Sequence, residues 1–358
     1  MQEGDGGGSE IGFCATAEAR TTVERNEKEM KALKFIKNMH ERMSRAGISI
    51  VSQTGDGPFF IGDDSSTFRD KIVAEQYERI CKAFNLTDSD QMRKMFHDVT
   101  CGEGNEWMTI NQLNSSALLS FLCFCGVGNE HRILIDGQDY NAVRFELRSD
   151  LKPCGRRHPV SNMDVVLLNT DIKKALFLES KFTEYLKPSK QLKVSSYYSG
   201  PKGRYKELLS NEEIGDNIFC KNGFWQTRNQ EKVYLEGIKQ MICHYLGIMD
   251  QVTAPDDAKW KSKDWEDIKN YDEIKLGEIV FKFDNCKDAF KSYSTAYNSL
   301  YKALNTYKLN TDINDEGKHK PTVTLRDKLL SYQEVFSGSN INVLNDIVGS
   351  FYCLGNEA

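Results

Sequence analysis

Three residues near the middle of the chain have the types and the spacing for phosphodiester chemistry. Asp164 stands at the head of the apolar run VVLL, and Glu179 and Lys181 follow a second apolar run, ALFL, on either side of Ser180. Carboxylates can hold Mg²⁺, and an ammonium can stabilise negative charge that develops on a phosphate. The sequence therefore predicts a site for Mg²⁺-dependent hydrolysis, with Mn²⁺ as a substitute ion.

The two apolar runs predict adjacent strands joined by a turn at 169–171, and such a hairpin brings Asp164 close to Glu179. Side chains alternate along a strand, so Glu179 and Lys181 share one face while Ser180 points to the other. The backbone carbonyl of Ser180 is a candidate third oxygen for the metal.

Spacing alone does not single out this site, because seven other acid–any–lysine triplets occur in the chain. Only 179–181 combines an apolar run directly upstream, a preceding strand that begins with an acid, and basic surroundings. The plain alternative is the solvated end of a strand.

These residues resemble the motif of the PD-(D/E)XK nuclease superfamily, which has the restriction-endonuclease-like fold. The resemblance implies an α/β protein with a mixed β-sheet flanked by helices, Asp164, Glu179 and Lys181 as catalytic residues, and Asp164, Glu179 and the Ser180 carbonyl as metal ligands. Met163 replaces the proline of the family name, at a position that varies widely.

One bacterial branch of restriction endonuclease-like proteins looks more closely similar. Its members follow the lysine with an aromatic residue and a glutamate, here Phe182 and Glu184, which implies a supporting role for Glu184. They also carry a Ser-Ser pair on a preceding helix, matched by 114–116, although Ala117 stands where a glutamine is expected. The resemblance covers roughly 111–300.

Three further residues each leave two interpretations open. Glu146, in the predicted strand 140–147, is either an outer metal-binding acid or a cross-strand surface charge. Gln240, on a predicted helix over 230–246, either supports the site by contacting phosphate or the lysine, as related nucleases suggest, or packs the helix. His244 on the same stripe is expected to be a packing or capping residue rather than a catalytic base.

The segment 151–206 is strongly basic, with twelve Lys and Arg residues against four acids, although the whole chain carries a formal charge of −5. A polyanion is attracted to such a segment, whereas a charge run is also typical of a solvated surface. The candidate nucleic-acid contacts are Arg156, Arg157, Lys190, Lys193, Lys202 and Arg204.

Composition is that of a globular protein, with 39% hydrophobic and 28% charged residues. The longest apolar run, 117–127, is too short to span a bilayer, and the N-terminus lacks the pattern of a secretory signal. We therefore expect a cytoplasmic protein with no membrane partner. The ten cysteines show no zinc-ligand spacing, so reduced thiols are expected.

The pattern divides the chain into a flexible tail at 1–22, a helical N-terminal region at 23–110, a nuclease-like core at 111–300 and a helical C-terminal extension at 301–358. Within the extension, 325–336 and 342–354 are predicted as helices. Further predictions are strands at 131–135 and 277–283 and helices at 111–125 and 286–304.

The sequence thus predicts a Mg²⁺-dependent nuclease that cleaves nucleic acid, most naturally DNA, by attack of an activated water. A nuclease-fold protein that binds nucleic acid without turnover is the alternative, as is a nuclease acting on RNA or structured DNA. The sequence leaves the oligomeric state open, and a homodimer is suggested only by analogy with restriction enzymes, which often pair to cut both strands.

Overall fold

The computed structural model describes residues 30–52, 59–61, 69–100, 106–153, 159–193, 195, 218–221, 224–227, 232–255, 257–306 and 321–354 of the 358-residue chain. The predicted tail at 1–22 lies outside these residues, as do Arg156, Arg157, Lys202 and Arg204.

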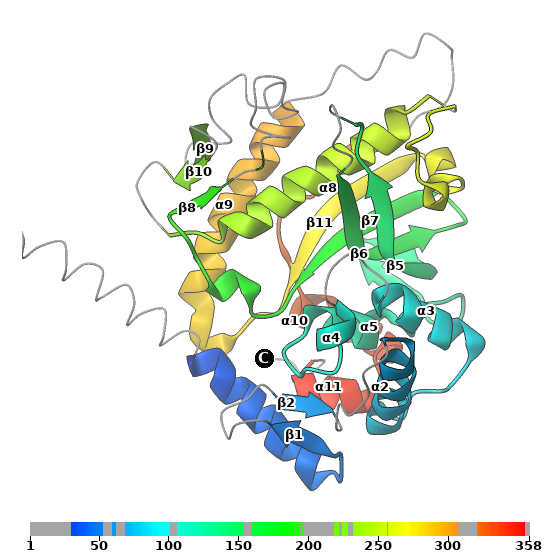
Figure 1. Ribbon diagram of the computed structural model, residues 1–358, viewed down its shortest axis with the longest axis vertical. Coiled ribbons are helices and arrows are strands. Elements are labelled where there is room, and N and C mark those ends of the chain that lie inside the picture. The colour runs from blue at the N-terminus through cyan, green and yellow to red at the C-terminus, as the bar shows by residue number, and fades with distance from the viewer. Residues whose placement is uncertain are drawn as a thin grey trace, which may run out of the picture.

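A six-stranded mixed sheet forms the centre of the molecule (Figure 1). Its path runs β12-β11-β7-β6-β5, and β13 pairs with β11 beyond the end of β12. The strands are β5 (Ala142–Asp150), β6 (Val160–Asn169), β7 (Lys174–Lys181), β11 (Glu273–Val280), β12 (Thr322–Leu325) and β13 (Leu330–Ser331). The first three pair antiparallel, whereas β11 is parallel to β7, β12 and β13.

The hairpin predicted at 163–184 is confirmed as β6 and β7. Val165 pairs with Leu178, and the ladder continues to Asn169 and Lys174. The side chain of Asn169 accepts backbone N–H groups from Asp171 and Ile172, which closes the turn. The ladder stops one pair before Asp164 and Glu179, so these two residues stand where the strands cease to pair.

Helices cover both faces of the sheet. On one face lie α8 (Leu235–Thr253), which crosses β5, β6 and β11, and α9 (Lys287–Thr306) beside it (Figure 1). The other face is covered by α5 (Ser116–Phe124), an almost wholly apolar and buried helix that packs on β6 and β7. These apolar contacts supply the main driving force for folding.

The N-terminal region and the C-terminal end of the chain pack together on the side of α5 (Figure 1). Phe96 contacts Phe121 of α5, and Phe84 contacts Phe351, so the same hydrophobic core continues through them. The elements are a helix over 30–45, α2 (Arg69–Phe84), α3 (Asp90–Thr100), α4 (Glu106–Thr109), α10 (Tyr332–Val335), α11 (Asp346–Tyr352), β1 (Ile50–Ser52) and β2 (Phe59–Ile61).

Short elements complete the described chain. A hairpin of β3 (Ile133–Ile135) and β4 (Gln138–Tyr140) turns at Asp136 and Gly137, whose φ values of 53° and 72° are typical of a tight hairpin turn. A small separate sheet contains β8 (Gln191–Lys193), β10 (Phe224–Thr227) and β9 (Ile218–Lys221). The 3₁₀ turns are Glu184–Leu186, Lys263–Trp265, Ile268–Asn270, Asp284–Cys286 and Gly338–Val343.

The predictions for β11 and α9 are confirmed with shifted ends, and so is the helix predicted at 230–246, which the structure has at Leu235–Thr253. The helix predicted over 325–336 is wrong for most of its length. Residues 330–331 instead form β13 beside β11, and only one helical turn, α10, follows. Its leucines fit either structure, and pairing at the sheet decides between them.

None of the described helices is long and apolar enough to cross a membrane. The six cysteines described in the structure are free thiols, as expected; they are Cys81, Cys123, Cys125, Cys243, Cys286 and Cys353.

Candidate active site

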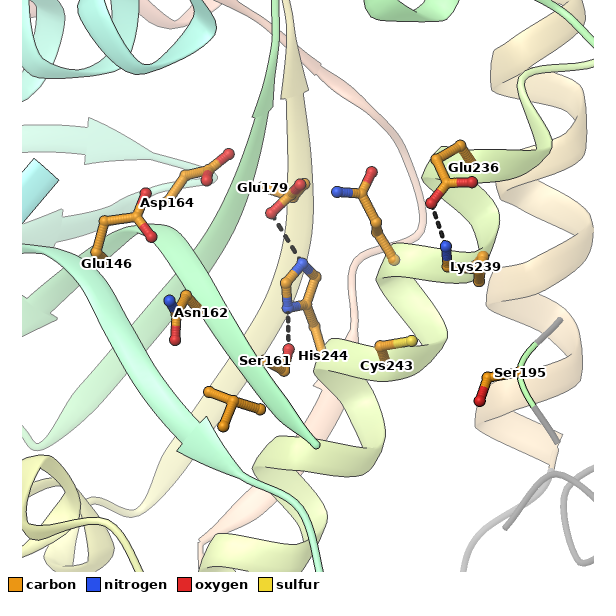
Figure 2. Close-up of a pocket in the computed structure, with 12 residues that line it drawn as sticks. Glu146, Ser161, Asn162, Asp164, Glu179, Ser195, Glu236, Lys239, Cys243 and His244 are labelled. Atoms are coloured by element: carbon orange, nitrogen blue, oxygen red, sulfur yellow. Dashed lines mark hydrogen bonds and ion pairs between the residues drawn. The ribbon is translucent and has the colours of Figure 1, made fainter. Parts of the chain in front are cut away.

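A pocket of about 430 Å³ opens between α8 and the ends of β5, β6 and β7 (Figure 2). Three carboxylates line it from three adjacent strands: Glu146 from β5, Asp164 from β6 and Glu179 from β7. The remaining lining residues are Val160, Ser161, Asn162, Ser195, Glu236, Lys239, Gln240, Cys243 and His244.

Glu179 is held at both carboxylate oxygens although it is only 2% exposed. Its Oε1 accepts a hydrogen bond from Nζ of Lys181 at 2.5 Å. Its Oε2 lies 2.8 Å from Nε2 of His244, at ion-pair distance but without the alignment of a hydrogen bond. Glu179 and Lys181 therefore share one face of β7, as strand alternation predicts.

These contacts decide the charge of the pair. Burial alone would raise the pKa of Glu179, but the ammonium of Lys181 and the neighbouring imidazole of His244 lower it to about 2. Burial likewise opposes the charged form of Lys181, and the negative charge of Glu179 raises the pKa of its ammonium well above the ordinary value. Lys181 is not among the described residues that line the pocket, so it acts on the pocket through Glu179.

Asp164 carries its charge less readily. Its Oδ2 accepts the backbone N–H of Ser180 at 2.7 Å, which joins β6 to β7 beyond the end of their ladder. The surrounding protein shields the Asp164 carboxyl from water, and this shielding raises its pKa well above its usual range. The neighbouring charges of Glu179 and Glu146 raise it further. Crowded carboxylates of this kind favour a bound cation or proton.

Glu146 has an unusual backbone. Its φ of 48° lies in the left-handed region, and the β5–β6 ladder passes from the Phe145–Val165 pair to the Leu147–Met163 pair without it. A non-glycine residue in this region costs about 1–3 kcal/mol, and such strain clusters at functional sites. Glu146 lines the pocket, so the interpretation as an acid of the site is favoured over a surface charge.

Ser180 points to the opposite face, as predicted. Its hydroxyl donates to the carbonyl of Ser116 at 3.3 Å and lies 2.7 Å from the hydroxyl of Tyr332. Ser115 caps α5 by accepting the N–H of Leu118. The Ser-Ser pair thus anchors α5 behind the strand that carries the candidate residues. Coordination by the Ser180 carbonyl stays a prediction.

The two candidates on α8 both line the pocket. Gln240 is half-buried there, and its Oε1 has no hydrogen-bond partner among the described residues, which leaves it available to a ligand. His244 is buried, as the packing interpretation expects, but it does not cap the helix. His244 lies in the middle of α8, and its Nδ1 is 2.5 Å from the hydroxyl of Ser161.

The remaining candidates lie outside the pocket lining. The side chain of Glu184 accepts the backbone N–H of Phe182 at 2.6 Å, which shapes the turn after β7. Lys190 and Lys193 are exposed at the two ends of β8, and Lys193 stands two positions before Ser195, which lines the pocket. Their contact with nucleic acid stays a prediction, and so does that of Arg156, Arg157, Lys202 and Arg204.

Sequence reasoning missed three residues beside the pocket. Ser161 contacts His244 across 83 positions of sequence, a pairing that no local pattern encodes. Asn162 precedes Asp164 by two residues on β6. Residues two apart on a strand point to the same face, so the sequence could have placed Asn162 beside Asp164. Glu278 on β11 pairs in register with Glu179 and is fully buried.

The described residues include no group of three or more His, Cys, Asp and Glu side chains arranged to hold a metal ion. Mg²⁺ commonly uses only one or two carboxylates and takes its other oxygens from water and substrate phosphate. Asp164 and Glu179, with Glu146 near them, are a donor set of that type. All are oxygen ligands, which suits Mg²⁺ or Mn²⁺ better than zinc.

In comparisons with protein-family models, with curated proteins and with solved structures, none matched this chain.

Proposed function

We propose that the protein is a Mg²⁺-dependent nuclease that hydrolyses phosphodiester bonds of DNA at the pocket beneath α8. The observation that carries this proposal is the meeting of Glu146, Asp164 and Glu179 in one pocket, with the buried ammonium of Lys181 on Glu179. Carboxylates concentrated beside a cation are the groups that position a divalent metal and a phosphate.

The arrangement of elements supports the proposal of a restriction-endonuclease-like fold. Asp164 stands on β6 directly before its pairing with β7, Glu179-Ser180-Lys181 end β7, and Gln240 lines the pocket from α8 further along the chain. This order agrees with the resemblance of the motif to PD-(D/E)XK nucleases.

Each residue then has a definite task. Asp164 and Glu179 hold the cation, which when bound activates water and offsets charge on the scissile phosphate. Lys181 keeps Glu179 ionised and oriented, because its Nζ donates to Oε1. Gln240 presents to the substrate an amide whose Oε1 has no partner among the described residues, and the exposed Lys190 and Lys193 are candidates to track the phosphate backbone.

Nicking of supercoiled plasmid tests this function. The full chain is incubated with Mg²⁺, Mn²⁺ or EDTA beside Glu179→Gln, purified in the same way. We expect nicking by the parent with either metal and none with EDTA or from the variant. Equal activity of parent and variant would assign the cleavage to another site or to a contaminant.

The same assay separates the alternatives. Cleavage of an RNA or of a branched DNA, with none of plasmid, would keep the chemistry and change the substrate. Retardation of DNA in a gel without cleavage of any of these substrates would support the nucleic-acid-binding protein that lacks turnover. Sedimentation of the protein with and without DNA would show whether two copies pair as a homodimer.

A further inference from the structure

Ser161, His244 and Glu179 form a continuous chain of contacts along one wall of the pocket (Figure 2). The hydroxyl of Ser161 lies 2.5 Å from Nδ1 of His244, and Nε2 of the same ring lies 2.8 Å from Oε2 of Glu179. All three side chains are more than nine-tenths buried. These contacts link β6, α8 and β7 near the point where β6 and β7 stop pairing.

The two sides of Glu179 are therefore occupied by different groups. Lys181 engages Oε1 and His244 engages Oε2, so rotation of the carboxylate would break one contact or the other. Ser161 in turn fixes the plane of the imidazole, because Nδ1 meets its hydroxyl. A carboxylate oxygen offers two lone-pair positions, so Oε2 can face His244 and still accept a cation.

We propose that His244, oriented by Ser161, is a positioning residue that sets the direction of the Glu179 carboxylate for a divalent cation. This inference rests on the proposed function, since it assigns Glu179 to the metal. Groups that hold a ligating side chain from behind change metal affinity by about 10- to 100-fold when they are removed. His244 reaches the metal only through Glu179.

Two other roles of His244 predict different changes in metal affinity. If His244 competed with the cation for Oε2, its removal would free the oxygen and tighten metal binding. If the histidine only packed α8, its removal would lower stability and leave metal affinity unchanged. The sign of the change in affinity therefore distinguishes the three roles.

Direct Mn²⁺ binding by the full chain, measured by calorimetry or by the electron paramagnetic resonance of free Mn²⁺, tests the proposal. We expect His244→Ala to weaken binding by about 10- to 100-fold and Ser161→Ala by less. His244→Gln should recover part of the loss, because its amide can still contact Glu179. The matched control is Ser149→Ala, since Ser149 is the register partner of Ser161 on β5 and does not line the pocket.

Activity supplies a second readout. Nicking by the His244 variants should require more Mg²⁺, whereas kcat at saturating Mg²⁺ should fall much less than the metal affinity. Unchanged or tighter Mn²⁺ binding by both His244→Ala and His244→Gln would overturn the positioning role while leaving the nuclease proposal intact. Absence of Mn²⁺ binding by the parent at millimolar concentration would overturn the proposed function, and this inference with it.

Discussion

Two glutamates lie side by side on adjacent strands of the sheet, and their surroundings give them opposite charge states. Glu179 on β7 and Glu278 on β11 pair in register, and both are almost completely buried. Lys181 and His244 outweigh the effect of burial on Glu179 and lower its pKa to about 2. Burial raises the pKa of Glu278 to about 8, and its near partner is the hydroxyl of Tyr293, which donates to Oε2 at 2.7 Å.

The comparison shows that burial alone does not decide the charge of a carboxyl group. Buried charges persist only where opposite charges or hydrogen bonds compensate the loss of water. The β7 end has such partners and remains charged, as a metal site requires. The β11 position has a neutral donor, so Glu278 carries a proton near neutral pH and serves as a buried hydrogen-bonding group.

The largest expected effect follows from removing the Lys181 ammonium, which keeps Glu179 charged while Glu278 is neutral. Lys181→Ala should lower nicking by at least about 10²- to 10³-fold while DNA affinity, measured by gel retardation, stays close to that of the parent. The control is Lys174→Ala at the far end of β7, where Lys174 pairs with Glu273. Equal loss of activity in both variants would remove the special role of Lys181.

Stability should distinguish the two sites as well. Lys181→Met leaves the buried charge of Glu179 without its nearest partner and should lower the free energy of unfolding by about 3–5 kcal/mol. Glu278→Gln replaces an already neutral group by one of similar shape, and the variant takes up no proton on folding, so the free energy of unfolding at pH 7 should stay the same or rise. Urea denaturation at pH 7 measures both, and similar losses would mean that Glu278 is ionised in the folded protein.

The two carboxyls should also give opposite dependences of stability on pH. The folded pKa of Glu278, about 8, exceeds its ordinary value of 4.5, so its contribution is fully present below pH 4.5 and is lost as the pH rises to about 8. The slope is at most about 1.4 kcal/mol per pH unit.

Glu179 behaves in the reverse way, because its contribution is present above its ordinary value of 4.5 and disappears as the pH falls toward 2. Urea denaturation of the parent and of Glu278→Gln at several values between pH 5 and 8 isolates the Glu278 slope. A slope that survives in the variant must come from another group.

The smallest of the four effects concerns Gly237 of α8, whose lack of a side chain leaves room for the Tyr293 hydroxyl that contacts Glu278. A Cβ on Gly237 of α8 would lie 2.1 Å from the Tyr293 hydroxyl and 2.7 Å from the ring of Tyr234. Tyr293 is only 1% exposed, so it has little room to move. We expect Gly237→Ala to lower the free energy of unfolding by about 1–3 kcal/mol.

Gly247→Ala is the matched control for this change. It lies on the same helix, and its Cβ would meet nothing closer than 3.1 Å. Both substitutions gain the same helix propensity, so the difference between the two variants in thermal or urea denaturation reports the crowding at Tyr293. No difference would show that the contact with Tyr293 costs no more than the 3.1 Å contact with Ser149.

Much of the site could be predicted because successive side chains of a strand point to opposite faces of the sheet. This alternation placed Glu179 and Lys181 on one face and Ser180 on the other, and the hairpin placed Asp164 beside them. The helical stripe on α8 likewise indicated Gln240, which lines the pocket. Local periodicity carries this information, so a single sequence contains it.

The chain by itself therefore determined the hairpin, the faces of its residues and the helix that covers them, since these follow from the backbone geometry of each element. Only the tertiary structure decided the contacts of Ser161 with His244, the pairing of Glu278 with Glu179 and the strand at 330–331. Such contacts join residues far apart in sequence. Their energies depend on packing and on neighbouring charges, which no local pattern records.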